Sequence, residues 1–482
     1  MSSLLLPRQQ KLNQLFHLMV VFAVLGPTLG VPVIPGFKLT LFRLFFLTLA
    51  AGLFIRWARS RDLESSHMHP VRWYTAFFAF WVVYAAVSLT WAGSLGLGLK
   101  YLTFLVTMLL LCLSFPFFLK GSSHIEQTGR VLFWAFFIIV VYGLIESVTY
   151  WHLPASRYFG RESSNVTSFF SNQNDFATAI TLGLPFLVTA LYMLAARRKA
   201  KVLIYLTGII TLCDLFLTGS RSNSGFALPL VAVTWLALIP FTVERSKRNF
   251  RNLLKGAGLL LLAVVVTGGL LSSVLSDQTR SKLGSTLGVF NDLQSSWTLP
   301  NEDDIPLDEE EASSRDQSIS IRKALIMNGL HFLARSHYLG VGAGNIEYYM
   351  LGAPGVGAKS NIHNWWAEVL VNFGVGVFLL YMTLYFWMLW RLFRLARVKE
   401  AVGLSPVIRW GATASFIALI GYFFGGMSPS TAIHFTPMWI VYGFALAVIA
   451  VGERQRYAAR HKEEGKTAVS SHSAHADSRD LR

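Results

Sequence analysis

Long apolar segments recur along most of the chain, separated by shorter polar ones. An α-helix of about 20 residues crosses the ~30 Å hydrocarbon core of a bilayer. We count twelve apolar segments of about this length, at residues 12–33, 38–56, 71–92, 98–119, 130–151, 174–196, 202–219, 223–243, 255–275, 364–390, 406–427 and 432–452. The pattern therefore predicts an all-α polytopic membrane protein with about twelve transmembrane helices.

The spacing of these spans divides the chain into four parts. We expect nine transmembrane helices in residues 1–275, one large periplasmic loop in 276–363, three transmembrane helices in 364–452 and a disordered cytoplasmic tail in 453–482. The large loop includes an acidic run at residues 302–316, which is typical of a solvated insert. Residues 318–334 have a helical composition, so we expect the loop to contain helices.

Composition excludes several classes of protein. Hydrophobic residues make up 53% of the chain and charged residues only 14%, against about 25% charged residues in an average soluble domain. A soluble enzyme and a disordered chain are therefore excluded. Only two cysteines are present, and both lie in apolar segments, so a disulfide framework is excluded as well.

The net charge of +16 reflects orientation in a membrane and does not indicate a nucleic-acid partner. Lys and Arg are concentrated in every second connection, which the positive-inside rule assigns to the cytoplasm. They are Arg8, Lys11, Arg56, Arg59, Arg61, Arg197, Arg198, Lys199, Lys201, Arg245, Lys247, Arg248, Arg251, Arg391, Arg394, Arg397, Lys399, Arg454 and Arg456. We expect both termini in the cytoplasm and membrane lipids around the chain.

Three polar clusters lie at the outer face, each where a span begins its inward run. They are residues 171–175, 219–225 and 361–364. Helix N-termini present free N–H groups and a partial positive charge, which favour anions. Arginines that could bind a phosphate bidentately stand beside them: Arg157, Arg161, Arg221, Arg280, Arg315, Arg322 and Arg335. Together these features indicate a lipid-linked phosphate or pyrophosphate.

Each of these residues also has a plainer interpretation. Ser and Asn at helix starts are ordinary caps, and capping is the simpler explanation for Asn172 and Ser222 taken alone. Arg322 could be a surface charge on a helix. Arg221 differs, because a charge in a tight turn beside the membrane is costly without a function. His363 precedes two tryptophans and could belong to an interfacial belt, yet its imidazole is also the natural proton acceptor near neutral pH.

Other polar residues lie within the spans and support an alternative. Arg43, Glu146, Asp175 and Asp214 would suit a transporter of lipid-linked sugars, and the sequence leaves open whether Arg43 and Glu146 pair. Transporters often have two related halves, but no such repeat is visible here. A non-catalytic membrane scaffold is a third interpretation. The clustering of polar residues at one face favours an enzyme.

Two motif searches limit the chemistry further. The outer segments lack an Asp-x-Asp pair, so we expect no metal and no metal-bridged sugar nucleotide. The glycines of residues 340–344 do not have the spacing of a dinucleotide loop and follow no strand. They predict a tight, close-packed turn, and we expect no cofactor.

Taken in order, these motifs resemble the O-antigen ligase and polymerase superfamily of bacterial membrane glycosyltransferases. The matching segments are 217–222, Arg322, 339–345, His363-Asn364, Leu370 and 374–376, with the Asn-containing start of a span at 169–174. The sequence departs from the family pattern at Ile326, His337 and Asn372, where tryptophan, proline and an acidic residue are common. None of the departures falls on Arg221, Arg322 or His363.

The resemblance implies a metal-independent, inverting transfer of a glycan from undecaprenyl pyrophosphate to an acceptor hydroxyl at the periplasmic face of the inner membrane. His363, Arg221 and Arg322 would be catalytic. The substrate-binding residues would be Arg157, Arg161, Asn174, Ser222 and Asn364. The acceptor would be lipid A-core in a ligase, or a growing glycan in an O-antigen or exopolysaccharide polymerase.

Two observations favour the ligase over the polymerase. The best-known polymerases carry an Arg-x10-Gly pattern in two outer loops, and none of the outer arginines here has a glycine eleven residues later. A single dominant outer loop is also more typical of a ligase. The identity of the sugar and of the acceptor stays open.

Overall fold

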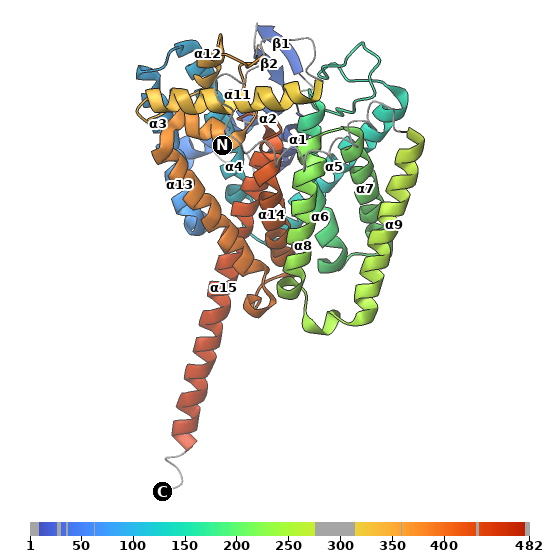
Figure 1. Ribbon diagram of the computed structural model, residues 1–482. Helices are drawn as coiled ribbons and strands as arrows, with labels where there is room; N and C mark the ends of the chain where they lie inside the picture. Colours follow the sequence, from blue (N-terminus) through green and yellow to red (C-terminus); the bar gives the residue numbers. More distant parts are fainter. Residues whose placement is uncertain are drawn as a thin grey trace.

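The computed structural model describes residues 9–26, 30–34, 37–61, 63–274, 314–357, 359–429 and 433–477. Long helices run side by side as a bundle, and short elements cover one end of it (Figure 1). In the described part of the chain, eleven helices are long and apolar enough to cross a membrane. The predicted all-α, multi-pass membrane protein is therefore confirmed.

These eleven helices agree closely with the expected spans. They are α2 (Leu41–Ser60), α3 (Arg72–Val87) with its flanking 3-10 turns Ser66–Val71 and Ser88–Thr90, α4 (Leu95–Phe118), α5 (Ser122–Thr149), α6 (Gln173–Met193), α7 (Arg198–Leu217), α8 (Leu228–Thr242) with the preceding π-helical turn η4 (Asn223–Ala227), α9 (Phe250–Val274), α13 (Trp365–Ala396), α14 (Pro406–Gly425) and α15 (Thr436–Asp477). Short 3-10 turns at Arg245–Lys247 and Val398–Glu400 complete the connections.

The first predicted span, residues 12–33, differs from the structure. Helix α1 covers Gln9–Val24, 16 residues, and is shorter than the predicted span. The side chain of Gln9 accepts a hydrogen bond from Arg56, near the C-terminal end of α2, so α1 lies alongside α2. The chain then forms an antiparallel hairpin of β1 (Gly30–Ile34) and β2 (Phe37–Thr40). The physical reason lies in the sequence, which has prolines at 27, 32 and 35, and proline ends a helix because it has no N–H to donate.

Helices α4, α6, α14 and α15 form the centre of the bundle, where α14 packs on α6 and α15 on α4. Small residues allow this close approach. A Cβ atom at Gly443 of α15 would lie 2.6 Å from the carbonyl oxygen of Cys112, and one at Gly411 of α14 would lie 2.8 Å from Val448. By contrast, α9 makes its extensive contacts with α7 alone. Most leucine and valine side chains of α9 are exposed.

One end of the bundle, here named the hairpin end, carries β1–β2, the connection at residues 150–172, α11 (Ser314–Arg335) and α12 (Ile346–Met350). Helix α11 lies across this end of the bundle (Figure 1). Its Leu325 is fully buried against Ile346, Ile362 and Val371. A helix therefore occupies the predicted segment 318–334, whereas most of the acidic run 302–316 lies outside the described residues.

A glycine contact joins the segment after α11 to a break in α13. Gly374 has φ 79° and interrupts the helix. Residues 338–342 pair alongside the break, with the Val341 N–H donating to the Val371 carbonyl at 2.9 Å. A Cβ at Gly340 would lie 2.5 Å from the Gly374 nitrogen, so only glycine fits. The predicted close-packed turn is confirmed.

The C-terminal segment differs from the expected disordered tail. Helix α15 continues through Asp477 and extends beyond the bundle on the side opposite the hairpin end (Figure 1). Residues 453–477 contain no proline and are rich in Ala, Glu, Lys and Arg, which favour helix. A helix already nucleated in the core therefore continues, because each added residue gains a backbone hydrogen bond.

Candidate active site

Arg221 lies in the turn between α7 and α8, at the hairpin end of the bundle. Gly219, with φ 63°, makes the sharp reversal possible, and the π-helical turn η4 follows. The buried Asn223 amide donates to the hydroxyls of Thr178 at 3.1 Å and Ser428 at 3.0 Å. The Ser222 hydroxyl also donates to Ser428, at 3.0 Å. This network fixes the turn that carries Arg221, and the observed role of Ser222 is structural.

His363 lies just before α13, in a conformation that non-glycine residues rarely adopt (φ 50°). The next residue, Asn364, is the N-cap, and its side-chain oxygen accepts the N–H groups of Trp366 at 3.0 Å and Ala367 at 3.2 Å. The Trp365 N–H donates to the Gly426 carbonyl at 2.9 Å, which ties this start to the end of α14. The observed role of Asn364 is capping, and a contact with substrate stays a prediction.

Three cations lie near His363, and a fourth, Arg221, lies near one of them, Arg322. Burial, followed by the nearby charge of Arg221, lowers the pKa of Arg322. Burial also lowers the pKa of His363 to about 4, helped by the positive charges of Arg322, Lys359 and Arg157. The structure thus brings together Arg221, Arg322 and His363, which are far apart in sequence. We call Arg157, Arg221, Arg322 and Lys359 the cation cluster.

The cation cluster has no balancing anion among the described residues. None of its four side chains forms a hydrogen bond or an ion pair within that part of the chain. Gathered like charges repel one another and favour the binding of an anion. Guanidinium groups bind phosphate oxygens with two parallel hydrogen bonds. The arrangement can therefore hold a phosphate or pyrophosphate next to a neutral imidazole.

Two contributors to this site, Lys359 and Pro429, are not marked by any sequence motif. Lys359, four residues before His363, looked like an ordinary loop lysine, but its charge helps to lower the pKa of His363. Pro429 follows Ser428 in the connection after α14, and its backbone carbonyl accepts a hydrogen bond from the His363 ring. No motif marks Ser428 or Pro429. They matter because they link the turn of Arg221 to His363.

The site residues predicted in and just after the first outer connection differ in whether they lie near the cation cluster. The Arg157 N–H donates to the Ser171 carbonyl at 2.9 Å, and its side chain is near His363 and Lys359. Asn174 lies in the first turn of α6, where its N–H donates to the Asn172 cap at 2.9 Å. The Arg161 side chain is exposed and pairs with no described residue. The structure does not join Arg161 to the cation cluster.

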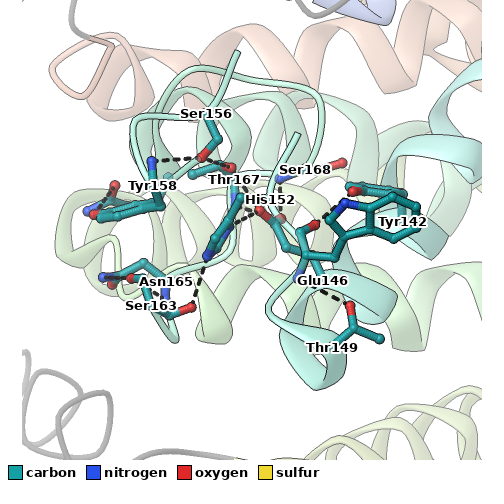
Figure 2. Close-up of polar contacts among 12 residues, drawn as sticks. Tyr142, Glu146, Thr149, His152, Ser156, Tyr158, Ser163, Asn165, Thr167 and Ser168 are labelled. Atoms are coloured by element: carbon teal, nitrogen blue, oxygen red, sulfur yellow. Dashed lines mark hydrogen bonds and ion pairs between the residues drawn. The ribbon is translucent and has the colours of Figure 1, made fainter. Parts of the chain in front are cut away.

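A buried carboxylate holds the connection that carries Arg157 (Figure 2). Glu146 of α5 accepts the Thr167 N–H at 2.8 Å, the Thr167 hydroxyl at 2.9 Å and the Ser168 N–H at 2.5 Å. The His152 Nδ1 lies 2.6 Å from the same carboxylate. Glu146 therefore pairs with this connection and with His152, and it does not pair with Arg43, a possibility that the sequence left open.

Loss of this carboxylate should loosen the connection. We expect Glu146→Ala to raise the rate of tryptic cleavage after Arg157 and Arg161 at least tenfold, because each buried donor left unpaired costs about 1–3 kcal/mol. The measurement is limited proteolysis of the purified protein in nanodiscs. Glu126→Ala, at the partly exposed opposite end of the same helix, is the matched control and should leave cleavage unchanged. Equal cleavage of both variants would contradict the assigned role of Glu146.

Two comparisons with known proteins give a match. Residues 206–382 match the family described as O-antigen ligase. That segment includes Arg221, Arg322, Lys359 and His363, whereas Arg157 precedes it. The chain is also similar to the teichuronic acid biosynthesis protein TuaE of Bacillus subtilis (strain 168), with 27% identity over 430 residues that cover 87% of this chain and 80% of the relative.

Proposed function

We propose that this O-antigen ligase family protein transfers a glycan from an undecaprenyl-pyrophosphate carrier to an acceptor hydroxyl. The observation that carries the proposal is the cation cluster, which forms no ion pair with a described residue and lies beside His363. A pyrophosphate supplies the missing negative charge, and its glycan would lie beside the imidazole. No metal is assigned a role, because cationic side chains supply the charge that a metal would otherwise provide.

The reaction follows from this arrangement. The acceptor oxygen forms a bond to the anomeric carbon while the bond from that carbon to the pyrophosphate oxygen breaks, so the configuration inverts. The acceptor proton passes to His363 as general base. The electron pair of the broken bond remains on the pyrophosphate, where Arg221 and Arg322 stabilise the growing negative charge. The products are the extended acceptor and undecaprenyl pyrophosphate.

Charge distribution supports an orientation in the bacterial inner membrane. The connections at the end of the bundle opposite the hairpin end carry most of the basic residues, which favours the cytoplasm for that end. The hairpin end and the cation cluster would then face the periplasm, with both termini in the cytoplasm. A lipid-linked donor in the outer leaflet would present its pyrophosphate at the level of the cluster.

The low pKa of His363 predicts an unusual pH profile. A base must be deprotonated to accept a proton, and the lowered pKa keeps His363 neutral until the pH falls to about 4. The acid limb of kcat/KM, which reports the free enzyme, should therefore lie near pH 4. Bound pyrophosphate offsets the cations and raises the pKa, so the acid limb of kcat should lie at higher pH. An acid limb of kcat/KM at pH 6.5 or above would contradict this assignment.

The proposal has two forms, which differ in the acceptor of the glycan. Lipid A-core as acceptor corresponds to a ligase, which the single large loop and the lack of an Arg-x10-Gly pattern favour. A growing glycan corresponds to a polymerase, which the relative named for teichuronic acid biosynthesis supports. Both use the same donor and the same described site, so the acceptor must be determined by experiment.

Reconstitution separates these outcomes. Purified protein in liposomes receives an undecaprenyl-pyrophosphate glycan and EDTA, with or without lipid A-core, and the products are resolved by gel. A shifted lipid A-core band that is absent in His363→Ala would establish a ligase. A ladder of longer carrier-linked glycans without added acceptor would establish a polymerase. Absence of both products, with the donor instead moved across the bilayer, would replace the proposal with transport.

A further inference from the structure

A large cavity of about 840 Å³ lies within the bundle. Its walls come from α5, α6, α7, α14 and α15 and from the short connection between α6 and α7. It runs from Phe170 and Pro437, at the hairpin end, to Arg130 and Arg197, at the opposite end. No residue of the cation cluster lines the cavity, so it is a different site from the one beside His363.

Small residues create this space, and aromatic rings bound it. Ala179 and Ala190 of α6 and Ala200 of α7 line the cavity, where larger side chains would fill it. The indole of Trp410 in α14 forms part of the wall, and its N–H donates to the carbonyl of Phe186 at 3.1 Å. The polar group of this ring is therefore satisfied within the protein and needs no ligand.

The chemistry of the lining determines what can fill the cavity. Among the described residues that line it, only Glu126, Arg130 and Arg197 are charged, and all three lie at the end opposite the hairpin end. Protein interiors contain few voids larger than a water molecule, and an ordered water needs two to four polar partners. A cavity this large and apolar therefore suits a hydrocarbon chain, which the membrane supplies.

The cavity opens between α5 and α7. These helices touch near the hairpin end, where a Cβ at Gly143 of α5 would lie 2.8 Å from the carboxylate of Asp214 in α7. Farther from the hairpin end, Trp134 of α5 and Ala200 of α7 line the cavity and are exposed. A lipid chain can thus enter from the membrane leaflet at the end opposite the hairpin end.

Four cations at this opening have no ionic partner among the described residues. Arg197 lines the cavity, and three further basic residues follow it in the next four positions, Arg198, Lys199 and Lys201. None of the four forms an ion pair with a residue that the structure describes. Positive charge therefore gathers where a lipid headgroup would lie.

The carboxylates at this end of the bundle are already paired with other cations. Those with described side chains pair as follows: Glu64 with Arg56 and Lys120, Glu126 with Arg130, Glu244 with Lys247, Glu400 with Arg394, Arg397 and Arg456, and Glu453 with Arg391. The described part of the chain thus offers no carboxylate to offset the four cations. An anion from the membrane would do so.

We propose that this cavity holds an acyl chain of an anionic phospholipid, with the lipid phosphate against Arg197 and its basic neighbours. Basic pockets between transmembrane helices bind acidic lipid headgroups, and a guanidinium group binds phosphate oxygens with two parallel hydrogen bonds. A lipid that contacts five helices at once would stabilise their packing. The proposal is independent of the proposed glycan transfer and concerns a ligand that is not consumed.

Photocrosslinking in a membrane tests the proposal. The full-length protein in phosphatidylcholine nanodiscs receives a trace of phosphatidylglycerol or of phosphatidylcholine, each with a diazirine near the end of one acyl chain. Mass spectrometry of the peptides then locates the attached lipid. We expect phosphatidylglycerol to label the cavity walls, residues 129–136 and 182–190, at least tenfold more than phosphatidylcholine does, because only phosphatidylglycerol carries a net negative charge.

Two variants, each with a matched control, separate the cavity from general contact with lipid. Ala200→Trp should reduce labelling of the walls at least tenfold by filling the opening, whereas Val202→Trp, at an exposed position of α7 outside the cavity lining, should not. Arg197→Gln should reduce the preference for phosphatidylglycerol at least threefold. Arg245→Gln, an exposed arginine at the same end but outside the lining, should leave that preference unchanged. Thermal unfolding checks that each variant is folded.

Three results would overturn the proposal. The first is equal labelling of the cavity walls by both lipids, and the second is undiminished labelling in Ala200→Trp. The third is displacement of the probe by undecaprenyl pyrophosphate but not by excess phosphatidylglycerol, which would assign the cavity to the lipid carrier. Because no turnover is measured, failure of the proposed glycan transfer would leave this test unaffected.

Discussion

Arg322→Ala should lower kcat by about 100- to 1,000-fold while the protein remains folded in the membrane. The guanidinium lies in the cation cluster, near Arg221 and His363, where the departing pyrophosphate would gather negative charge. Removing one preorganised donor from such a site costs about 2.7–4 kcal/mol in transition-state stabilisation. The measurement is single-turnover transfer from the lipid-linked donor in proteoliposomes, with thermal unfolding as the test of folding.

Two further substitutions in α11 test whether the loss of rate is specific to the guanidinium at position 322. Arg335→Ala removes an exposed guanidinium from the last turn of α11 and should leave the rate within a factor of two. Arg322→Lys keeps the charge but loses the planar fork, so its rate should fall between those of the wild type and Arg322→Ala. If Arg335→Ala and Arg322→Ala had equal rates, Arg322 would be a surface charge and not part of the site.

His363→Gln should lower the single-turnover rate by about 100- to 10,000-fold, the usual contribution of a general base. Glutamine approximates the size of imidazole and can still form a hydrogen bond with the Pro429 carbonyl, but it cannot accept the acceptor's proton. Donor affinity should change little, because the cation cluster remains. The comparison therefore separates proton transfer from pyrophosphate binding.

The control for this variant is another histidine at the same end of the protein. His331→Gln changes an exposed residue of α11 and should retain full activity. A second check is the pH profile, since the acid limb assigned to His363 should vanish from the residual activity of His363→Gln. A rate for His363→Gln within threefold of the wild type would remove His363 from the mechanism.

Much of the bundle could be predicted from sequence, because a bilayer restricts spanning segments to long apolar helices. The eleven confirmed helices follow from this constraint alone. The short α1 and the hairpin after it could not be predicted from apolarity, since residues 12–33 remain apolar through the prolines that end the helix. The extension of α15 has the opposite cause, because a polar segment made of good helix formers continues a helix that begins in the core.

The candidate site was only partly predictable. Arg221, Arg322 and His363 could be proposed because each lies in a motif of the family, but no local pattern shows that they meet in space. Lys359 and Pro429 acquire their roles through tertiary packing alone and lie in no pattern. The Asn364 side chain caps α13, and the Ser222 hydroxyl fixes the turn of Arg221 through Ser428. A contact of either residue with a substrate stays a prediction.

The contact between Gly340 and Gly374 also determines how Arg322 is held in place. Helix α11 is anchored at its C-terminal end, where residues 338–342 pair with the break in α13 and the apolar side of α11 rests on Ile362 and Val371. The position of Arg322 is consequently set by the chain that follows it. A change in the length of the acidic segment before α11 should therefore leave the guanidinium of Arg322 in place, because the contacts that position it all come from residues after this segment.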